Sequence, residues 1–281
     1  MKYCDLHCDL LDKIRTPAAW TDEGDLQITP ASLCGGVFLQ VFAVFAENTR
    51  ADMAYFRAKA SLFQKIKARA AACGVRAVLS VENGSMAEER AENVGEMLAA
   101  GVKLFGLVWN GGNALGGAHD TGGGLTAWGK TVVEFLAAEG ALPDVSHLSD
   151  AGFAEVAAIM KACRKPFVAS HSCARALCPH SRNLTDGQLR ALADAGGLAG
   201  VNFYPPFLGG FSLAQHIAYM IDVCGEDAVA LGSDFDGMAG GYYKNCADAA
   251  QRIEGDLERA GLSFRQIEKV LQQNVLRLLG D

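Results

Sequence analysis

The stretch Asp5-Leu6-His7-Cys8-Asp9, close to the start of the chain, combines an imidazole with carboxylates at a spacing that suits metal binding. Apolar or β-forming residues flank it, so we predict a short strand. Side chains alternate across a strand, which places His7 and Asp9 on one face and Cys8 on the other. Histidine nitrogen and carboxylate oxygen are both zinc ligands. An ordinary hydrogen-bonded pair explains the same spacing, so the metal interpretation needs support from elsewhere in the chain.

Eight short apolar segments with the composition of buried strands recur along the 281 residues. They are continuous apolar runs, as in a parallel sheet that is covered on both faces. We expect them near residues 3–10, 35–44, 75–81, 102–109, 141–146, 166–170, 197–203 and 228–233. Eight β/α units in about 250 residues predict a (β/α)8 TIM barrel, with residues 1–281 as its single domain. A doubly wound open sheet is the alternative that periodicity leaves open.

Helices are predicted between most of these strands from their length and their end signals. Thr126 and Ser149 are candidate N-caps, and Gly74, Gly101 and Gly140 are candidate stops. We expect the helices at 51–73, 86–100, 126–139, 149–163, 185–195, 212–224, 247–259 and 264–279.

Polar residues gather where the predicted strands end, which is where active sites of such barrels lie. Three of the six histidines are among them. The residues are His7, Asp9, Glu82, His147, His171 and Asp234. Neutral imidazoles with two or three carboxylates suit two divalent ions such as Zn²⁺, Mn²⁺ or Co²⁺, and Glu82 can give one oxygen to each. Singly, each residue has a plainer explanation: Glu82 as a helix cap, and the two later histidines as partners of the backbone.

Eight short stretches, in order and spread over nearly the whole chain, resemble the membrane dipeptidase (renal dipeptidase) family of binuclear zinc peptidases. They are Asp5–Asp9, Ser80–Glu82, Gly124–Gly129, Asp144–His147, Ser170–Ser172, Arg182–Asn183, Val201–Tyr204 and Gly232–Gly237. The family fold is a (β/α)8 barrel of the metallo-dependent hydrolase type, which agrees with the strand pattern.

The resemblance implies a metal site with two zinc ions. His7 and Asp9 would hold one ion, His147 and His171 the other, and Glu82 would bridge them. A hydroxide shared by the two ions would then attack the peptide carbonyl.

The resemblance also implies how a dipeptide is held. Arg182 matches the arginine that grips the substrate's terminal carboxylate, and its planar fork suits a bidentate pair. Asp234 matches the aspartate near the hydroxide and the substrate amine, where it can pass a proton to the leaving nitrogen. Tyr204, at the end of a matching stretch, is a further candidate for substrate binding. Members of the family accept short substrates, including dipeptides with a D-residue at the C-terminal position.

Two positions depart from the family pattern. Trp109 stands where much of the family has a histidine that contacts the scissile carbonyl, and an indole N–H can donate a hydrogen bond but carries no charge. Asn83-Gly84-Ser85 replaces a frequent Gly-Gly-His. We hypothesise that His119, in the Gly-rich loop 111–124, folds over the metals and supplies the missing imidazole; a solvent-exposed loop histidine is the alternative.

Composition excludes several other classes. The net charge of −7 and the lack of a Lys/Arg cluster argue against nucleic-acid binding. Neither a signal peptide nor an apolar run of about 18 residues is recognisable, so no membrane contact is expected. The nine cysteines are odd in number and scattered, which favours reduced, mostly buried thiols in a cytoplasmic protein. The oligomeric state stays open, with a homodimer among the options.

The sequence therefore predicts a cytoplasmic, metal-dependent dipeptidase whose partner is a small peptide substrate. Another barrel metallohydrolase, acting on lactones, N-acyl amino acids or phosphoesters, is the first alternative. A descendant that binds a ligand without turnover is the second, and Trp109 is the feature that supports it.

Overall fold

The centre of the molecule is one sheet of eight parallel strands, paired in sequence order from β1 to β8. The structure, a computed structural model, describes residues 1–280. Backbone bonds join the first and last strands, and the amide of Leu6 donates to the carbonyl of Leu231 at 2.9 Å. The sheet therefore closes into a barrel, which confirms the predicted (β/α)8 fold and excludes the open sheet. The strands are β1 (Tyr3–Asp5), β2 (Val37–Val44), β3 (Arg76–Val81), β4 (Val102–Gly106), β5 (Leu142–Asp144), β6 (Val168–Ala169), β7 (Leu198–Val201) and β8 (Val229–Leu231).

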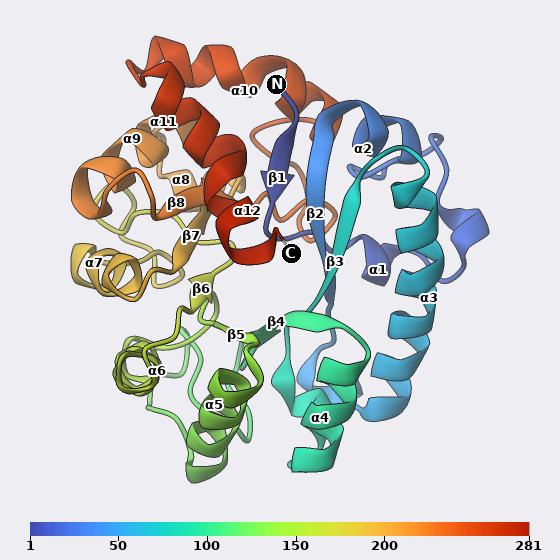
Figure 1. Cartoon of the computed structure of the whole chain (residues 1–281), viewed down its shortest axis with the longest axis vertical. Helices are drawn as coiled ribbons and strands as arrows, with labels where there is room; N and C mark the ends of the chain where they lie inside the picture. Colours follow the sequence, from blue (N-terminus) through green and yellow to red (C-terminus); the bar gives the residue numbers. More distant parts are fainter. Residues whose placement is uncertain (281) are drawn as a thin grey trace.

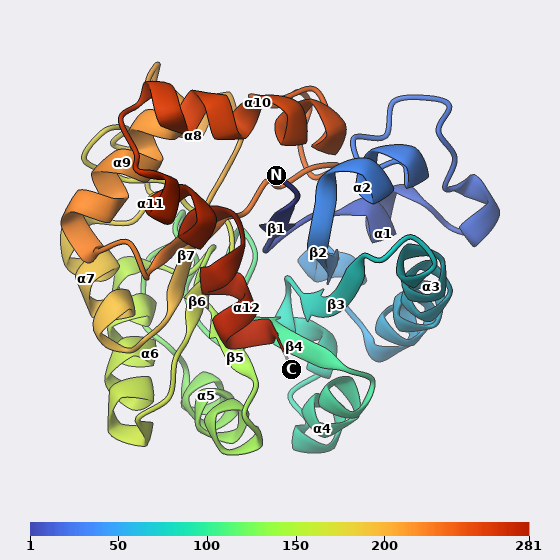
Figure 2. The same cartoon turned by 45° about the horizontal axis from the view of Figure 1, so that its top comes forward.

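Helices surround the strands on the outside of the barrel, while α12 lies in front of the ring of strands, near its centre (Figures 1 and 2). The helices are α1 (Leu10–Lys13), α2 (Pro30–Gly36), α3 (Met53–Ala71), α4 (Ala91–Ala99), α5 (Ala127–Glu139), α6 (Asp150–Cys163), α7 (Asp186–Asp194), α8 (Pro205–Leu208), α9 (Leu213–Cys224), α10 (Cys246–Arg259), α11 (Phe264–Glu268) and α12 (Asn274–Leu279). None of the helices within residues 1–280 is long and apolar enough to cross a membrane.

The predicted capping residues begin their helices as expected. The Thr126 hydroxyl accepts the amide of Gly129 and the Ser149 hydroxyl accepts that of Gly152, each at 3.0 Å. These bonds satisfy amides that have no partner inside the helix. Gly140 ends α5 at a φ of 73°, a left-handed conformation that glycine adopts without a steric penalty.

The prediction of a helix over 86–100 is wrong for its first residues. Gly84–Ala87 forms a 3₁₀ turn, Glu88 and Glu89 take left-handed conformations with φ of 51° and 55°, and α4 begins only at Ala91. A carboxylate oxygen of Glu88 accepts the amide of Met53 at the start of α3, so a tertiary contact interrupts the helical run.

Two other boundaries differ because of packing. Residues 35 and 36 end α2 instead of starting a strand. Gly36 packs so closely against α10 that a Cβ there would lie 2.8 Å from the carbonyl oxygen of Cys246. The single helix expected over 264–279 is α11 and α12 joined through a π-helical segment, Lys269–Gln273.

The expectation that all cysteines are reduced is corrected by a disulfide between Cys34 and Cys73. The Cα atoms of the two residues lie 5.5 Å apart, within the range that a disulfide can span. Their positions are 39 apart in the sequence, so no short motif indicates the pair. The other seven cysteines are free thiols.

Candidate active site

The six polar residues predicted at the ends of the strands lie together at the carboxyl end of the barrel. They follow β1, β3, β5, β6 and β8, and parallel strands bring these ends to one rim. Each is at least nine-tenths buried: His7, Asp9, Glu82, His147, His171 and Asp234. A cavity of about 370 Å³ is lined by four of them: Asp9, Glu82, His147 and Asp234.

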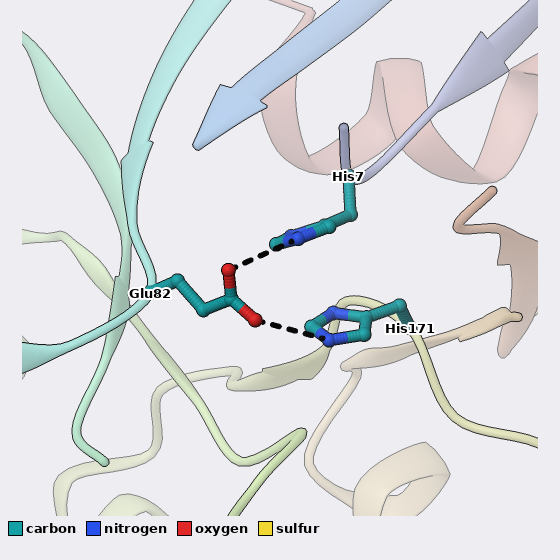
Figure 3. A group of neighbouring side chains, drawn as sticks. All are labelled: His7, Glu82 and His171. Atoms are coloured by element: carbon teal, nitrogen blue, oxygen red, sulfur yellow. Dashed lines mark ion pairs between the residues drawn. The ribbon is translucent and has the colours of Figure 1, made fainter. Parts of the chain in front are cut away.

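Glu82 lies at the centre of the group, and its two oxygens face different imidazoles. Oε2 is 3.5 Å from Nε2 of His7, while Oε1 is 3.6 Å from Nε2 of His171 (Figure 3). Oε1 also lies 2.9 Å from Nε2 of His147, which is 3.1 Å from Nε2 of His171. A carboxylate placed in this way can bind one ion through each oxygen.

His7 is close to three carboxylates. Its Nε2 lies 3.4 Å from Asp9, 3.5 Å from Glu82 and 3.8 Å from Asp234. Two groups of three bring their ligand atoms within 4.8 Å of one another: His7 with Glu82 and His171, and His7 with Asp9 and Asp234. The arrangement differs from the predicted grouping in that His7 also faces the ligands assigned to the second ion.

The ligand atoms have the chemistry that a divalent cation requires. Nε2 of His7 and Oδ1 of Asp9 are buried and have no hydrogen-bond partner within residues 1–280. Burial and the neighbouring Glu82 raise the pKa of Asp9 to about 6, and burial raises that of Asp234 to about 8. Both shifts mean that the carboxylates lack enough compensating positive charge. A bound cation supplies that charge, so these residues fit a metal site.

Hydrogen bonds to the second ring nitrogens orient the two later histidines. Nδ1 of His147 lies 2.9 Å from Oδ1 of Asn110, an oxygen that only accepts, so Nδ1 carries the proton. Nδ1 of His171 lies 2.7 Å from the hydroxyl of Ser170, which donates in turn to Asp144. Burial lowers the pKa of both imidazoles. Both are therefore neutral, with an Nε2 lone pair available to a metal.

Arg182 brings a buried positive charge to the edge of the metal-ligand group. One guanidinium nitrogen, Nη2, lies 3.1 Å from Nε2 of His147, and the guanidinium carbon lies 5.6 Å from the centre of the Phe207 ring. The other, Nη1, is buried without a hydrogen-bond partner among the described residues. A donor held ready in this way suits an anionic group entering the cavity.

Of the other residues predicted to contact the substrate, Trp109 and His119 line the cavity and Tyr204 does not. Trp109 lines the cavity, with its ring centre 6.4 Å from that of His147. Tyr204 is not among the lining residues and packs against Phe207, with ring centres 5.2 Å apart. His119 also lines the cavity, but its Nε2 lies 3.1 Å from Asn110 Oδ1 and its Nδ1 2.8 Å from Ser181 Oγ. Both nitrogens of His119 are thus already engaged, and burial lowers its pKa to about 4.

Several functional positions were not predicted from the sequence. Asn110 orients His147 and His119 through one oxygen, and Phe45, His180 and Met238 complete the cavity wall. They lie in loops, where no periodicity indicates which side chains turn inward. Phe45 and Asn110 did have a signal, because they directly follow the ends of the second and fourth predicted strands.

Gly237 packs directly against the carboxylates of Asp9 and Asp234. A Cβ at this position would lie 2.3 Å from Oδ2 of Asp9 and 2.4 Å from Oδ1 of Asp234. Nearby, Asp236 has a structural role, since its carboxylate accepts the amides of Gln27 and Ile28 at 2.7 and 3.1 Å.

An eight-stranded β/α barrel with buried histidines and carboxylates at the carboxyl ends of its strands is the architecture of a metal-dependent hydrolase. Residues 36–281 match the family described as Membrane dipeptidase (Peptidase family M19), and the chain belongs to that family. It is therefore a hydrolase of the metallopeptidase type. The matched residues begin after His7 and Asp9, so the interpretation of these two residues as possible metal ligands depends on their geometry in the structure.

Curated relatives include an uncharacterized Klebsiella pneumoniae protein encoded in the pqqA 5′ region, 39% identical over 199 residues. That alignment covers 64% of this chain and 72% of the relative. Dipeptidase aclJ of Aspergillus oryzae is 36% identical over 170 residues, which cover 57% of this chain and 39% of the fungal protein. The alignment thus spans well under half of the fungal enzyme.

Among solved structures, a metallo peptidase from Rhodobacter sphaeroides, liganded with a phosphinate mimic of the dipeptide L-Ala-D-Ala, superposes with a TM-score of 0.86. It is 24% identical, and the superposition covers 100% of this chain and 99% of that one. The dipeptidase AC gives a TM-score of 0.85 at 24% identity, over 99% and 98% of the two chains. At this identity the likeness establishes the fold.

The Asn110 contact predicts a metal-affinity defect. Replacing Asn110 with Leu removes the acceptor for His147 Nδ1–H, so we expect metal affinity to fall about 10–100-fold. Asn110→Asp keeps an oxygen acceptor and should restore most of the affinity. Metal retained after dialysis against graded chelator is the measurement, and equal retention in all three proteins would contradict the orienting role.

The fit of Gly237 gives a second prediction. In Gly237→Ala the new methyl group displaces the Asp9 and Asp234 carboxylates, so metal retention should fall by about tenfold or more. Gly95→Ala is the matched control, because a Cβ there meets nothing within 4 Å. Near-normal metal content in Gly237→Ala, with the control also unchanged, would show that these carboxylates do not serve as ligands.

Proposed function

We propose that the protein is a dipeptidase with two zinc ions at the carboxyl end of the barrel, Mn²⁺ or Co²⁺ being the substitutes. The observation that carries this proposal is the position of Glu82, whose two oxygens face different imidazoles. His7 and Asp9 would hold one ion and His147 and His171 the other, with Glu82 shared. Bound ions of this kind would supply Lewis acidity for the peptide carbonyl and a water of lowered pKa as nucleophile.

Arg182 would bind the C-terminal carboxylate of the dipeptide. Its guanidinium lies beside His147, and Nη1 is buried and has no hydrogen-bond partner among residues 1–280. Binding through two parallel N–H groups would fix the carboxylate and so place the scissile bond over the metal ligands. The aromatic side chains of Phe45, Trp109 and Phe207 line the same cavity and would exclude water around the substrate. Tyr204 would support this wall from behind Phe207.

Asp234 would handle the proton. The side-chain amide of Asn202 donates to its Oδ2 at 2.9 Å, which leaves Oδ1 facing His7 and the cavity. A carboxylate held in this orientation can accept a proton from the attacking water and give it to the leaving nitrogen. Trp109 and His119 both line the cavity and are candidates for contacts with the substrate, Trp109 through its indole N–H. His119 would have to exchange its contact with Asn110 or Ser181 for one with the substrate.

The Rhodobacter structure suggests a substrate stereochemistry, because its ligand mimics a dipeptide that ends in a D-residue. We propose the same tolerance for this chain. The cytoplasmic location and the homodimer stay predictions, and the Cys34–Cys73 disulfide weighs against the location because such bonds are uncommon in the cytosol.

Metal analysis with a substrate panel tests the proposal. We expect two ions per chain, hydrolysis of L,L and L,D dipeptides, and loss of activity on chelation that zinc restores. Asp9→Asn should lose one ion and nearly all turnover, whereas Asp25→Asn, at an exposed position, should lose neither. Hydrolysis of lactones, N-acyl amino acids or phosphoesters alone would favour another barrel metallohydrolase. Two ions without hydrolysis of any substrate would indicate a binding protein.

The assignment of Arg182 has its own test. Arg182→Lys keeps the charge but loses the planar fork, so kcat/KM for a dipeptide should fall about 10–100-fold. The wild type should prefer a dipeptide over its C-terminal amide, and the variant should lose most of that preference. Arg190→Lys, on the exposed face of α7, is the control. An unchanged preference in Arg182→Lys would place the carboxylate elsewhere.

A further inference from the structure

A second cavity, of about 700 Å³, lies at the end of the barrel opposite the metal ligands. Its wall includes the starts of β3 and β4, the turns that lead into β5 and β6, and parts of α3 and α12. The lining residues are Phe63, Gln64, Lys67, Ala71, Val75–Leu79, Ala100, Gly101, Lys103, Ala137, Gly140–Leu142, Lys165, Pro166 and Arg277–Leu279. We call this space the amino-end cavity.

The charge of the amino-end cavity is of one sign. Lysine and arginine side chains enter its wall from α3, β4, the turn before β6, and α12, and among the described residues the lining contains no aspartate or glutamate. They are Lys67, Lys103, Lys165 and Arg277, in addition to Arg76. In a chain with 32 acidic and 25 basic residues, so many cations around one cavity without an anion is a strong local excess.

The charges of four of these cations, Lys67, Lys103, Lys165 and Arg277, are not compensated by a carboxylate among residues 1–280. Within residues 1–280, Lys67, Lys103, Lys165 and Arg277 form no ion pair with a carboxylate. Arg277 donates to two backbone carbonyls, those of Gly196 and Asp227, each at 2.9 Å. Such bonds fix the direction of the guanidinium but do not neutralise it.

The floor of the amino-end cavity is apolar and held in place. Phe63, Val75 and Leu79 are buried and belong to the hydrophobic core. Arg76 donates to the carbonyl of Leu279 at 3.2 Å and to that of Gly280, which ties the end of α12 beside the cavity. The volume lies within the range of small-molecule sites, and cations over an apolar floor suit a ligand with an anionic group and an apolar body.

We infer that the amino-end cavity binds a small organic anion, a phosphate or a carboxylate attached to an apolar body. Lysine ammonium groups would meet the anion as point charges, and the apolar floor would cover the rest of the ligand. The concave shape concentrates the positive field, so an anion is attracted despite the protein's net charge. This site is separate from the metal ligands and does not depend on the proposed peptidase activity.

Calorimetric titration with four probes tests the inference: hexyl phosphate, hexanoate, inorganic phosphate and hexanol. We expect one of the two amphipathic anions to bind at least about tenfold more tightly than inorganic phosphate or hexanol, and its binding to weaken with added salt. Lys103→Gln/Lys165→Gln should weaken that binding about tenfold or more. Lys65→Gln/Lys161→Gln removes the same charge from exposed positions outside the cavity and should bind as the wild type does.

Two results would overturn the inference. One is that neither amphipathic anion binds at concentrations up to about 10 mM. The other is that the Lys103/Lys165 variant, shown to be folded by circular dichroism, binds as tightly as the control. Because dipeptide hydrolysis is measured separately, a failure here leaves the peptidase proposal standing, and the reverse also holds.

Discussion

The burial of three carboxylates around one imidazole is the constraint on which this end of the barrel depends. Asp9, Glu82 and Asp234 all lie within 3.8 Å of His7 Nε2 and are largely hidden from solvent. Removing several anions from water costs free energy unless positive charge or hydrogen bonds compensate them. A barrel could fill the same volume with apolar side chains at lower cost. The cluster is therefore explained by the cation that it can bind, which agrees with the metallopeptidase family to which the chain belongs.

The residues beneath the cluster connect it to the closure of the barrel. The Asp5 carboxylate accepts from the amide and hydroxyl of Ser233 at 2.7 and 2.6 Å and from the side chain of Gln40 at 2.9 Å, which joins β1 to β2 and to the end of β8. Asp234 takes a left-handed conformation with φ of 61°, and its amide donates to the carbonyl of His7. Backbone strain at this residue is tolerated because the surrounding bonds fix it. Closing the barrel and positioning its ligands are thus one set of interactions.

Sequence reasoning succeeded where one strong regularity acts. Alternation placed His7 and Asp9 at the site and Cys8 in the hydrophobic core, and parallel topology brought the strand ends to one rim. It failed where the outcome depends on a distant contact, as in the broken start of α4 and the Cys34–Cys73 disulfide. The cavity walls belong to this second class. Whether Trp109 lines the cavity and Tyr204 lies behind Phe207 is decided by loop conformations, for which the sequence has no period.

Helix dipoles explain part, but not all, of the charge at the amino end of the barrel. The carboxyl ends of the outer helices point to that face and carry partial negative charge, which favours cations there. Near β8, Lys269 meets this expectation but is paired with Glu226 and Asp227 at 2.7 and 2.6 Å. Around the amino-end cavity, Lys67, Lys103 and Lys165 have no such partners within residues 1–280, and no carboxylate of this part of the chain lines the wall. Dipoles therefore account for the presence of cations on this face. Dipoles do not explain why the described residues around the amino-end cavity include no carboxylate to pair with these lysines. A site for an external anion requires such unpaired cations.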